Sequence, residues 1–372
     1  MADVSEPENS ELGRYHRQML LPGIGEEGQR RLLGAHAAVI GCGALGTVAA
    51  EVLVRAGVGS VTVIDRDIVE WTNLQRQTLY EDADAREGTP KAAAAAARLG
   101  KVNSSVRVEG IVADFNAGNA ERLLGLDGRG RGAAESRAEA GVGVLVDGTD
   151  NFEARYLIND IAVKHGVPYV YGGAVGTRGM QMTVLPGVSA CMRCVFPEAP
   201  APGSVPTCDT AGVLASATGI IANVQAAEAI KVLLGRTDLI APTLLEFDLW
   251  TNVRRRIDLS KARDPGCVCC GQAAGRRFEY LDAGVGAGAV SLCGSASVQV
   301  LPGVGAAGGM DLDALVQRLA SHGEVQQTPH LLRAKLEAEG VELTVFRDGR
   351  AIVKGTTDLP RARAVYARFV GG

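Results

Sequence analysis

The chain has 372 residues, of which 38 are basic and 42 are acidic, so its formal net charge is −4. This balance, without a long basic run, argues against a nucleic-acid backbone or an anionic membrane as the natural partner. No apolar stretch reaches the length of a membrane span and no signal-peptide pattern is present, so we expect a cytoplasmic protein. Eight cysteines, four of them in Cys-x-x-Cys pairs, favour metal binding or thiol chemistry over disulfides.

Apolar periodicity predicts alternating strands and helices up to about residue 271. In chain order we expect short helices over 14–33, a strand at 36–40, a helix at 47–56, a strand at 60–64, a helix at 91–99, strands at 106–112 and 144–146, a helix at 159–164, strands at 169–171 and 180–185, a helix at 219–234 and two antiparallel strands over 244–258. This order predicts an α/β fold over residues 14–272: a Rossmann-like, doubly wound, mainly parallel sheet with an antiparallel extension.

Other segments lack such periodicity. Residues 1–13 are expected to be disordered, residues 125–143 to be a mobile insertion, and the proline-rich residues 197–206 to be irregular. Beyond Gly271 the composition changes, and we expect a linker over 273–289 and a small α+β domain of unknown role over 290–372. The clearest elements of that domain are predicted helices at 312–322 and 361–369 and a hairpin at 343–353 that turns at Asp348-Gly349.

The glycine-rich turn GCGALG, from Gly41 to Gly46, joins the first predicted strand to a helix. In such a turn Gly41 permits the bend, Gly43 lets the backbone approach a phosphate and Gly46 allows close packing, while the helix N-terminus attracts the anion. Asp65 ends the next strand, at about the ~20-residue spacing of a carboxylate that binds ribose hydroxyls. Because ribose is common to NAD and ATP, this pattern predicts a nucleotide site without choosing between them.

Polar residues after the strands supply candidate phosphate and metal ligands. Asn73, Arg76, Gln77 and Lys91 could gather near the phosphates, although Arg76 or Lys91 taken singly is equally typical of a solvated surface charge. Asp147 and Asp150 follow the strand at 144–146, where α/β folds place ligands. One of them could hold magnesium, and the alternative for Asp150 is a helix cap.

The cysteine spacing predicts a structural zinc site. Cys191 and Cys194 form one Cys-x-x-Cys pair and Cys267 and Cys270 another, which suits four tetrahedral thiolates with no position open to substrate. Cys269 could exchange with Cys270 as a ligand, but the loop from Cys267 to Cys269 would be too short to favour this. Cys208 precedes a helix expected to begin near Gly212 or later, and it is either a nucleophile activated by that helix or an inert buried thiol. The five histidines show no ligand spacing.

From Arg14 to Gly271 the chain carries an ordered series of motifs: RYHRQMLLPGIGEEGQ, GCGALG, AGVGSVTVIDRDIVEWTNLQRQ, Pro90-Lys91, DGTDN, CMRC, CDTAGV and CVCCG. In these motifs it resembles the ThiF/MoeB/HesA family of adenylyltransferases, which activate ubiquitin-like sulfur-carrier proteins. The resemblance implies a homodimer that uses ATP and Mg²⁺ to adenylate the carrier's C-terminal Gly-Gly carboxylate, with release of pyrophosphate. Ala44 stands where many members have glycine, a change that the turn should tolerate.

The resemblance also assigns roles to single residues. It implies that Asp65 binds the ribose, that Asn73, Arg76 and Lys91 hold the triphosphate, and that Asp150 positions Mg²⁺. Arg17 matches an arginine that the opposite subunit supplies, the zinc cysteines match throughout, and Cys208 falls where thiazole-type members place a cysteine that bonds covalently with the carrier. No rhodanese-like cysteine loop follows the core, so we expect the sulfur donor, a cysteine desulfurase or a rhodanese, to be another protein.

Other functions were weighed against this one. An NAD-dependent oxidoreductase explains the glycine turn and Asp65 but leaves Arg17, Arg76, Lys91 and the zinc tetrad without a role. A relative acting on tRNA conflicts with the acidic charge balance, and a non-catalytic module that binds ubiquitin-like proteins conflicts with the intact set of charged residues. The chain itself ends in Gly371-Gly372, but the helix predicted just before argues against a fused carrier.

Overall fold

The structure is a computed structural model of the full chain, and it describes residues 12–128, 141–200, 208–272, 275–283, 289–292, 297–301 and 310–371. The chain divides into two compact units, Met1–Gly284 and Val285–Gly372. Predictions for most of the N-terminus, for much of the insertion at 125–143, for most of the segment at 197–206 and for Gly372 fall outside the described residues. In the described part of the chain, no helix combines the length and apolarity needed to cross a membrane.

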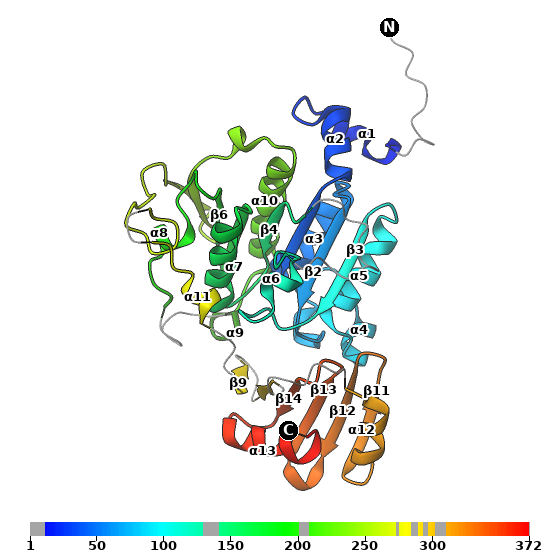
Figure 1. The fold of residues 1–372 in the computed structure, drawn as a ribbon. Coiled ribbons are helices and arrows are strands. Elements are labelled where there is room, and N and C mark those ends of the chain that lie inside the picture. Colours follow the sequence, from blue (N-terminus) through cyan, green and yellow to red (C-terminus); the bar gives the residue numbers. More distant parts are fainter. Residues whose placement is uncertain are drawn as a thin grey trace. The chain divides into compact units, whose positions relative to one another are not determined.

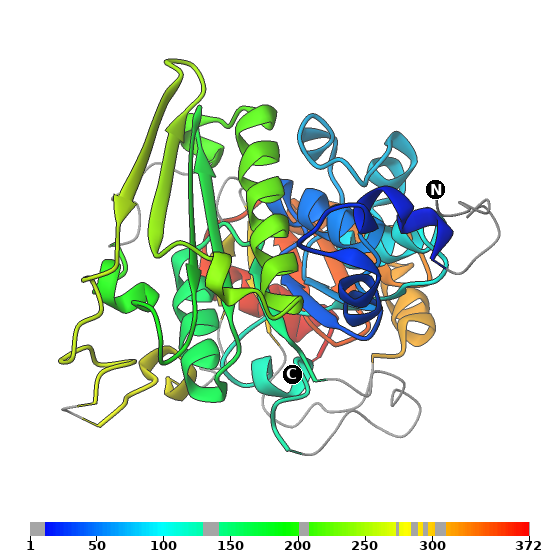
Figure 2. The ribbon, with the colours of Figure 1, turned by 90° about the horizontal axis from the view of Figure 1, so that it is seen from above.

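The first unit is built on an eight-stranded sheet of order β3-β2-β1-β4-β5-β6-β7-β8 (Figure 1). Its strands are β1 (His36–Ile40), β2 (Ser60–Asp65), β3 (Arg107–Val112), β4 (Val144–Asp147), β5 (Tyr169–Val175), β6 (Arg178–Val184), β7 (Thr243–Asp248) and β8 (Val253–Asp258). The first five strands pair in parallel and the last three join antiparallel. Figure 2 shows the β7–β8 hairpin as a long yellow-green arm. The predicted mainly parallel sheet with an antiparallel extension is therefore confirmed.

Helices cover both faces of this sheet. Ala37 and Val39 of β1 pack into one apolar cluster, while Ala38 and Ile40 pack into the other, which is why the strand is a continuous apolar run. The first cluster holds α3 (Ala44–Arg55), α5 (Lys91–Val102) and α10 (Ala215–Leu233), and the second holds α6 (Ala120–Leu123), α7 (Phe152–His165), α8 (Met192–Val195) and α11 (Glu279–Asp282). The remaining helical segments are η2 (Gly13–Tyr15), α1 (His16–Met19), α2 (Gly25–Leu33), η3 (Trp71–Asn73), α4 (Asp82–Glu87), α9 (Cys208–Ala211) and η4 (Thr237–Leu239).

Helix α7 is longer than the predicted helix at 159–164. Its N-terminus is capped by the Asn151 side chain, and Gly166 ends it with a left-handed φ of +70°. All residues from Ala154 to Val163 are buried. A helix buried on every side has no amphipathic period, so its first half gave no pattern to predict from.

Part of the predicted linker at 273–289 belongs to the first unit. Within it, the Tyr280 ring stacks on Tyr156 of α7 with 4.8 Å between the ring centroids. The Tyr280 N–H also donates to the Asp160 carboxylate at 2.9 Å. Helix α11 is thus fixed to α7 by a hydrogen bond and a ring contact, and it is not a free connecting segment.

The second unit is a six-stranded antiparallel sheet of order β11-β12-β13-β14-β10-β9. Its elements are β9 (Ala289–Leu292), β10 (Ser297–Val300), α12 (Leu312–Leu319), β11 (Gly323–Gln327), β12 (Leu331–Leu336), η5 (Glu337–Glu339), β13 (Val341–Phe346), β14 (Ala351–Lys354) and α13 (Leu359–Phe369). Both α12 and α13 pack on one apolar cluster. The predicted hairpin is present, with Leu343 opposite Val353. Strands β9 to β12 were not predicted individually.

Candidate nucleotide site and metal cluster

The glycine turn has two glycines that its own geometry requires and one that it does not. Gly41 has a φ of +84°, and a Cβ at Gly46 would overlap the Gly41 carbonyl oxygen. A Cβ at Gly43, in contrast, would meet nothing closer than 3.8 Å. Gly43 is the N-cap of α3, which begins at Ala44. The open face of Gly43 therefore suits close approach of a phosphate to the backbone and to the helix N-terminus.

Asp65, at the carboxyl end of β2, fastens the turn to the sheet. Its carboxylate accepts the N–H of Cys42 at 2.6 Å and the N–H of Asp67 at 2.7 Å. Burial raises the pKa of Asp65, and the Lys91 ammonium opposes that rise. Each carboxylate oxygen has a second lone pair, so ribose hydroxyls can still donate to it.

Lys91 is a buried cation and not a solvated surface charge. Its Nζ lies 3.1 Å from Asp67 Oδ2, and its backbone N–H donates to the Asp67 carbonyl at 2.8 Å. Burial alone would lower the pKa of Lys91, but the carboxylates of Asp67 and Asp65 outweigh it, with a further contribution from Asp150, and the pKa is raised. Lys91 thus lies within electrostatic range of Asp65, Asp67 and Asp150.

Arg66 and Asp67 were not among the predicted site residues. Arg66 Nη1 donates to Asp114 Oδ1 at 2.8 Å. Burial opposes its charge, but Asp67, Asp114 and Asp150 together raise the pKa of Arg66. The signal that could have found both residues is their place directly after a buried parallel strand, at the edge where ligands bind.

The two aspartates of DGTDN have different surroundings. Asp147 is fully buried: one carboxylate oxygen accepts the N–H and hydroxyl of Thr149 at 2.8 and 2.7 Å, and the other accepts the Tyr169 hydroxyl at 2.9 Å. Burial raises the pKa of Asp147. Asp150 is exposed, and α7 is capped by Asn151, which accepts the Ala154 N–H. The helix-cap alternative for Asp150 is therefore excluded, and Asp147 shapes the loop.

Arg155, one turn into α7, is a third residue that the sequence did not reveal. Its Nη2 donates to the Thr149 carbonyl at 2.9 Å, and its Nε lies 3.6 Å from Asp147 Oδ2. The Gly148 N–H donates to the Ile40 carbonyl at 2.7 Å, which places the DGTDN loop beside the glycine turn. Arg155 therefore holds the loop that carries Asp150.

The polar residues that follow β2 differ in their burial and in their hydrogen bonds. Asn73 is buried and its Oδ1 accepts the Glu70 N–H, while Arg76 donates to the Thr72 carbonyl at 2.8 Å on its own turn. Gln77 is buried, and its Oε1 has no hydrogen-bond partner among the described residues. Its Nε2 lies 3.9 Å from the position that a Cβ on Gly43 would take. An unpartnered buried amide beside the open face of Gly43 fits a polar ligand.

Arg17 lies far from this edge in its own chain. It is exposed on α1 and makes no hydrogen bond or ion pair with the part of the chain that the structure describes. The neighbouring Gln18 donates to the carbonyl of Ala56, which follows the C-terminal end of α3. Because α3 spans 12 residues, about 18 Å separate its two ends. Arg17 therefore lies at the opposite end of α3 from the glycine turn.

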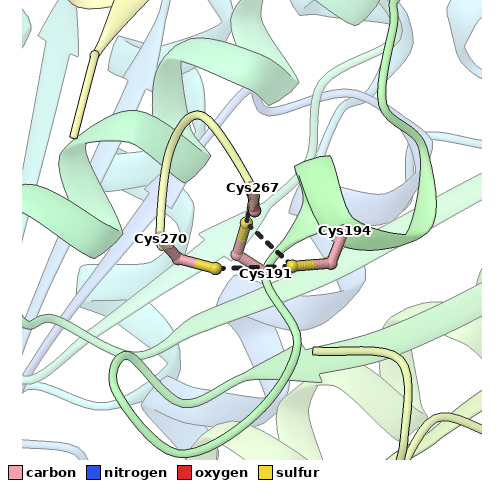
Figure 3. Close-up of side chains that lie close together, drawn as sticks. All are labelled: Cys191, Cys194, Cys267 and Cys270. Atoms are coloured by element: carbon pink, nitrogen blue, oxygen red, sulfur yellow. Dashed lines mark hydrogen bonds between the residues drawn. The ribbon is translucent and has the colours of Figure 1, made fainter. Parts of the chain in front are cut away.

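The four predicted metal ligands do converge (Figure 3). The sulfurs of Cys191 and Cys194 are 3.9 Å apart, those of Cys191 and Cys267 are 3.7 Å apart and those of Cys194 and Cys270 are 3.4 Å apart. All four lie within 4.8 Å of one another. A zinc–sulfur distance of about 2.3 Å would separate the sulfurs of a tetrahedral site by about 3.8 Å. The cluster has the ligands and the spacing to hold one metal ion.

The structure also distinguishes the remaining cysteines. Cys269 is buried, and its thiol donates to Asp160 Oδ1 at 3.4 Å and accepts from Asn159 Nδ2 at 3.3 Å. The sulfur of Cys270, and not that of Cys269, completes the four-cysteine cluster. Helix α10 begins at Ala215, which agrees with the expected helix that starts near Gly212 or later, and Cys208 itself is the first residue of the additional four-residue helix α9. The Cys208 side chain and Cys293 lie outside the described residues.

A nucleotide-binding edge on a doubly wound sheet, combined with a four-cysteine cluster, defines a class of nucleotide-dependent α/β proteins. Residues 15–269 match the model of the ThiF family, and the chain belongs to that family. It is 41% identical to the sulfur carrier protein ThiS adenylyltransferase of Bacillus subtilis over 360 residues, 96% of this chain and 99% of that relative. It is 40% identical to the sulfur carrier protein adenylyltransferase of Thermus thermophilus, over 73% of this chain and 95% of that one.

Solved structures agree on the fold. Escherichia coli MccB matches with a TM-score of 0.58 at 22% identity, covering 73% of this chain and 76% of that one. Its complex with ATP matches with a TM-score of 0.57 at 20% identity, over 72% and 76% of the two chains.

Proposed function

We propose that this chain uses ATP to adenylate the C-terminal Gly-Gly carboxylate of a ubiquitin-like sulfur-carrier protein and releases pyrophosphate. The observation that carries the proposal is the group of charged side chains at this edge of the sheet, where the buried Lys91 lies 3.1 Å from Asp67 and within electrostatic range of Asp150. The group lies beside the turn in which a Cβ on Gly43 would meet nothing closer than 3.8 Å. Membership of the ThiF family and the identity along nearly the whole ThiS adenylyltransferase support this reaction.

In this reaction a carboxylate oxygen of the carrier attacks the α-phosphorus of ATP. The bond from that phosphorus to the pyrophosphate oxygen breaks, and an acyl adenylate forms on the carrier. The chain's own residues bind and orient: Asp65 accepts the ribose hydroxyls, the Gly43 backbone receives a phosphate, and Lys91, Asn73 and Arg76 hold the triphosphate. Such transfers depend on placement and charge neutralisation, so the buried cation at Lys91 is central.

Magnesium fits the acidic side of this edge. Asp150 offers an exposed carboxylate that does not cap α7 and forms no ion pair within 4.0 Å among the described residues, and carboxylate oxygens are ligands that Mg²⁺ prefers. When bound, the ion would neutralise phosphate charge. We assign zinc to the four-cysteine cluster and a structural role to it, because four thiolates fill a tetrahedral ion.

We infer that the active form is a homodimer. Arg17 is exposed and lies a helix length away from the glycine turn of its own chain, so it can serve that edge only in a partner copy. The proposal keeps the expected cytoplasmic location and an external sulfur donor, a cysteine desulfurase or a rhodanese. It leaves Cys208 as a candidate for a covalent bond with the carrier.

ATP–pyrophosphate exchange with a panel of Gly-Gly carriers tests the proposal. We expect exchange that needs both a carrier and Asp150, so that Asp150→Ala lowers it about 100-fold or more. Asp82→Ala, which removes an exposed carboxylate from α4, is the matched control and should retain full exchange. Carrier-independent NADH oxidation without any exchange would instead favour the oxidoreductase.

A separate experiment tests whether Arg17 acts at the nucleotide edge of the partner copy. Arg17→Ala and Asp150→Ala should each be inactive alone, and mixing them after subunit exchange should restore part of the activity, because one edge of each mixed dimer is intact. Equal activity before and after mixing, in a verified heterodimer, would show that Arg17 does not complete the site of the partner copy.

A further inference from the structure

Two neighbouring side chains of α7 contact both loops of the four-cysteine cluster. Asn159 Oδ1 accepts the N–H of Met192, which lies between the ligands Cys191 and Cys194, at 2.8 Å. Asn159 Nδ2 donates at 3.3 Å to the thiol of Cys269, which lies between the ligands of the other pair. One asparagine therefore bonds a non-ligand residue inside each Cys-x-x-Cys loop.

Asp160 completes the same network. One oxygen accepts the Cys269 thiol at 3.4 Å, and the other accepts the N–H of Tyr280 in α11 at 2.9 Å. Cys269 thus accepts from one residue of α7 and donates to the next, which fixes the orientation of its thiol. The loop that carries Cys267 and Cys270 is held on its inner side by these bonds.

The burial of Asn159 and Asp160 explains how they can fix the positions of the two cysteine loops. Asn159 and Asp160 are fully buried, in the middle of a helix whose residues from Ala154 to Val163 are all buried. The loops that they bond are far apart in the chain, with Cys191 and Cys267 separated by 76 residues. Bringing such distant loops together has an entropic cost, and fixed contacts to a rigid helix reduce it.

We propose that Asn159 and Asp160 are positioning residues of the metal site, which hold the two loops so that their four thiols converge. Cys269 is the contact through which they act on the second loop and is not a spare ligand. The inference rests on the proposed zinc site and extends it to residues that do not touch the metal. Partners behind metal ligands typically contribute about 10- to 100-fold to metal affinity.

The test measures zinc affinity in the full-length protein by competition with a chelator of known affinity. Asn159→Ala should weaken binding about 10-fold or more, while the Co²⁺-substituted protein keeps the absorption bands of a tetrahedral thiolate site, because the ligands are unchanged. Cys269→Ala should also weaken binding, and Cys269→Ser, whose hydroxyl can keep both hydrogen bonds, should restore it. If Asn159→Ala does not fold, the two Cys269 variants still test the hydrogen bonds that join α7 to the second loop.

The matched control is Asn103→Ala. Asn103 is also buried, and its amide donates to the Tyr15 hydroxyl and the Val54 carbonyl away from the cluster, so its loss should destabilise the fold without changing zinc affinity. Equal zinc affinity in wild type, Asn159→Ala and Cys269→Ala would overturn the inference, as would an equal loss in Asn103→Ala. A wild-type protein that binds no zinc would instead refute the zinc site itself.

Discussion

Helix α7 connects two sites of opposite character. At its N-terminus the nucleotide edge leaves groups open: Asp150 is exposed, Gln77 Oε1 has no partner among the described residues, and a Cβ on Gly43 would meet nothing closer than 3.8 Å. In the middle of α7 the cysteine cluster is closed, because Asn159 and Asp160 bond to both loops. Unused polar groups indicate a place that receives a ligand, whereas groups that satisfy one another indicate a place that holds the fold.

Metal removal should have the largest effect, since it breaks the closed site. Cys270→Ser removes a ligand, and we expect the free energy of unfolding to fall by more than about 3 kcal/mol, because metal binding is coupled to folding. Cys269→Ser should leave both stability and zinc content near wild type. Urea denaturation with zinc analysis measures both quantities, and equal losses in the two variants would remove the distinction between ligand and non-ligand cysteine.

Two substitutions in the glycine turn separate structure from ligand binding. Gly46→Ala should cost more than about 3 kcal/mol of stability, since its Cβ would overlap the Gly41 carbonyl oxygen. Gly43→Ala should change stability by less than about 1 kcal/mol, since nothing lies closer than 3.8 Å to its Cβ. It should nevertheless weaken ATP binding about 10-fold, as measured by calorimetry. Unchanged ATP affinity would show that the open face of Gly43 does not receive the nucleotide.

Arg155→Met tests whether Arg155 stabilises the DGTDN loop that carries Asp150. The substitution leaves the Asp147 carboxylate buried without its cation, and we expect a loss of about 3 kcal/mol. Arg178→Met removes an ion pair between the exposed Arg178 and Asp248, and we expect no measurable change in stability. Thermal unfolding of both variants against wild type compares them, and a stable Arg155→Met would mean that the loop does not depend on this arginine.

The pH dependence of stability offers the smallest of these effects. Because burial raises the pKa of Asp147 above its unfolded value of 3.8, the folded state keeps the proton after the unfolded state has lost it. Stability from this group therefore falls as pH rises above 3.8 toward the folded pKa, by at most about 1.4 kcal/mol per pH unit. Asp147→Asn should lose this dependence in urea titrations across the acidic range. Parallel curves for wild type and variant would contradict the raised pKa.

The sequence indicated the candidate site residues more readily than the residues that hold them in position. The glycine turn, Asp65 and the four cysteines follow from local spacing, because a strand-to-helix turn and a Cys-x-x-Cys loop are each defined by a few consecutive residues. Spacing already favoured Cys270 over Cys269, but the contact of Cys269 with Asn159 of α7, 110 residues away in the chain, was not predicted. Such partners are set by packing across the fold, and a single sequence does not encode them in any local pattern.

The same limit applies within the nucleotide edge. Asp147 and Asp150 are only three residues apart, and their different roles depend on burial against Tyr169 and Arg155. Arg155 carried no motif, and the first half of α7 carried no period, so neither was predicted. The segment around α11 resembled a linker because its contacts with α7 involve a backbone N–H and one ring.

The central claim is that the open edge transfers AMP to a carrier's C-terminus, and intact-mass analysis of the carrier tests it most directly. After incubation with the enzyme, ATP and Mg²⁺, a Gly-Gly carrier should gain the mass of one AMP group. The gain should be absent with Asp150→Ala and with a carrier that lacks its last glycine. An unmodified carrier, across the whole panel, with a folded wild-type enzyme that binds ATP and zinc, would contradict the account.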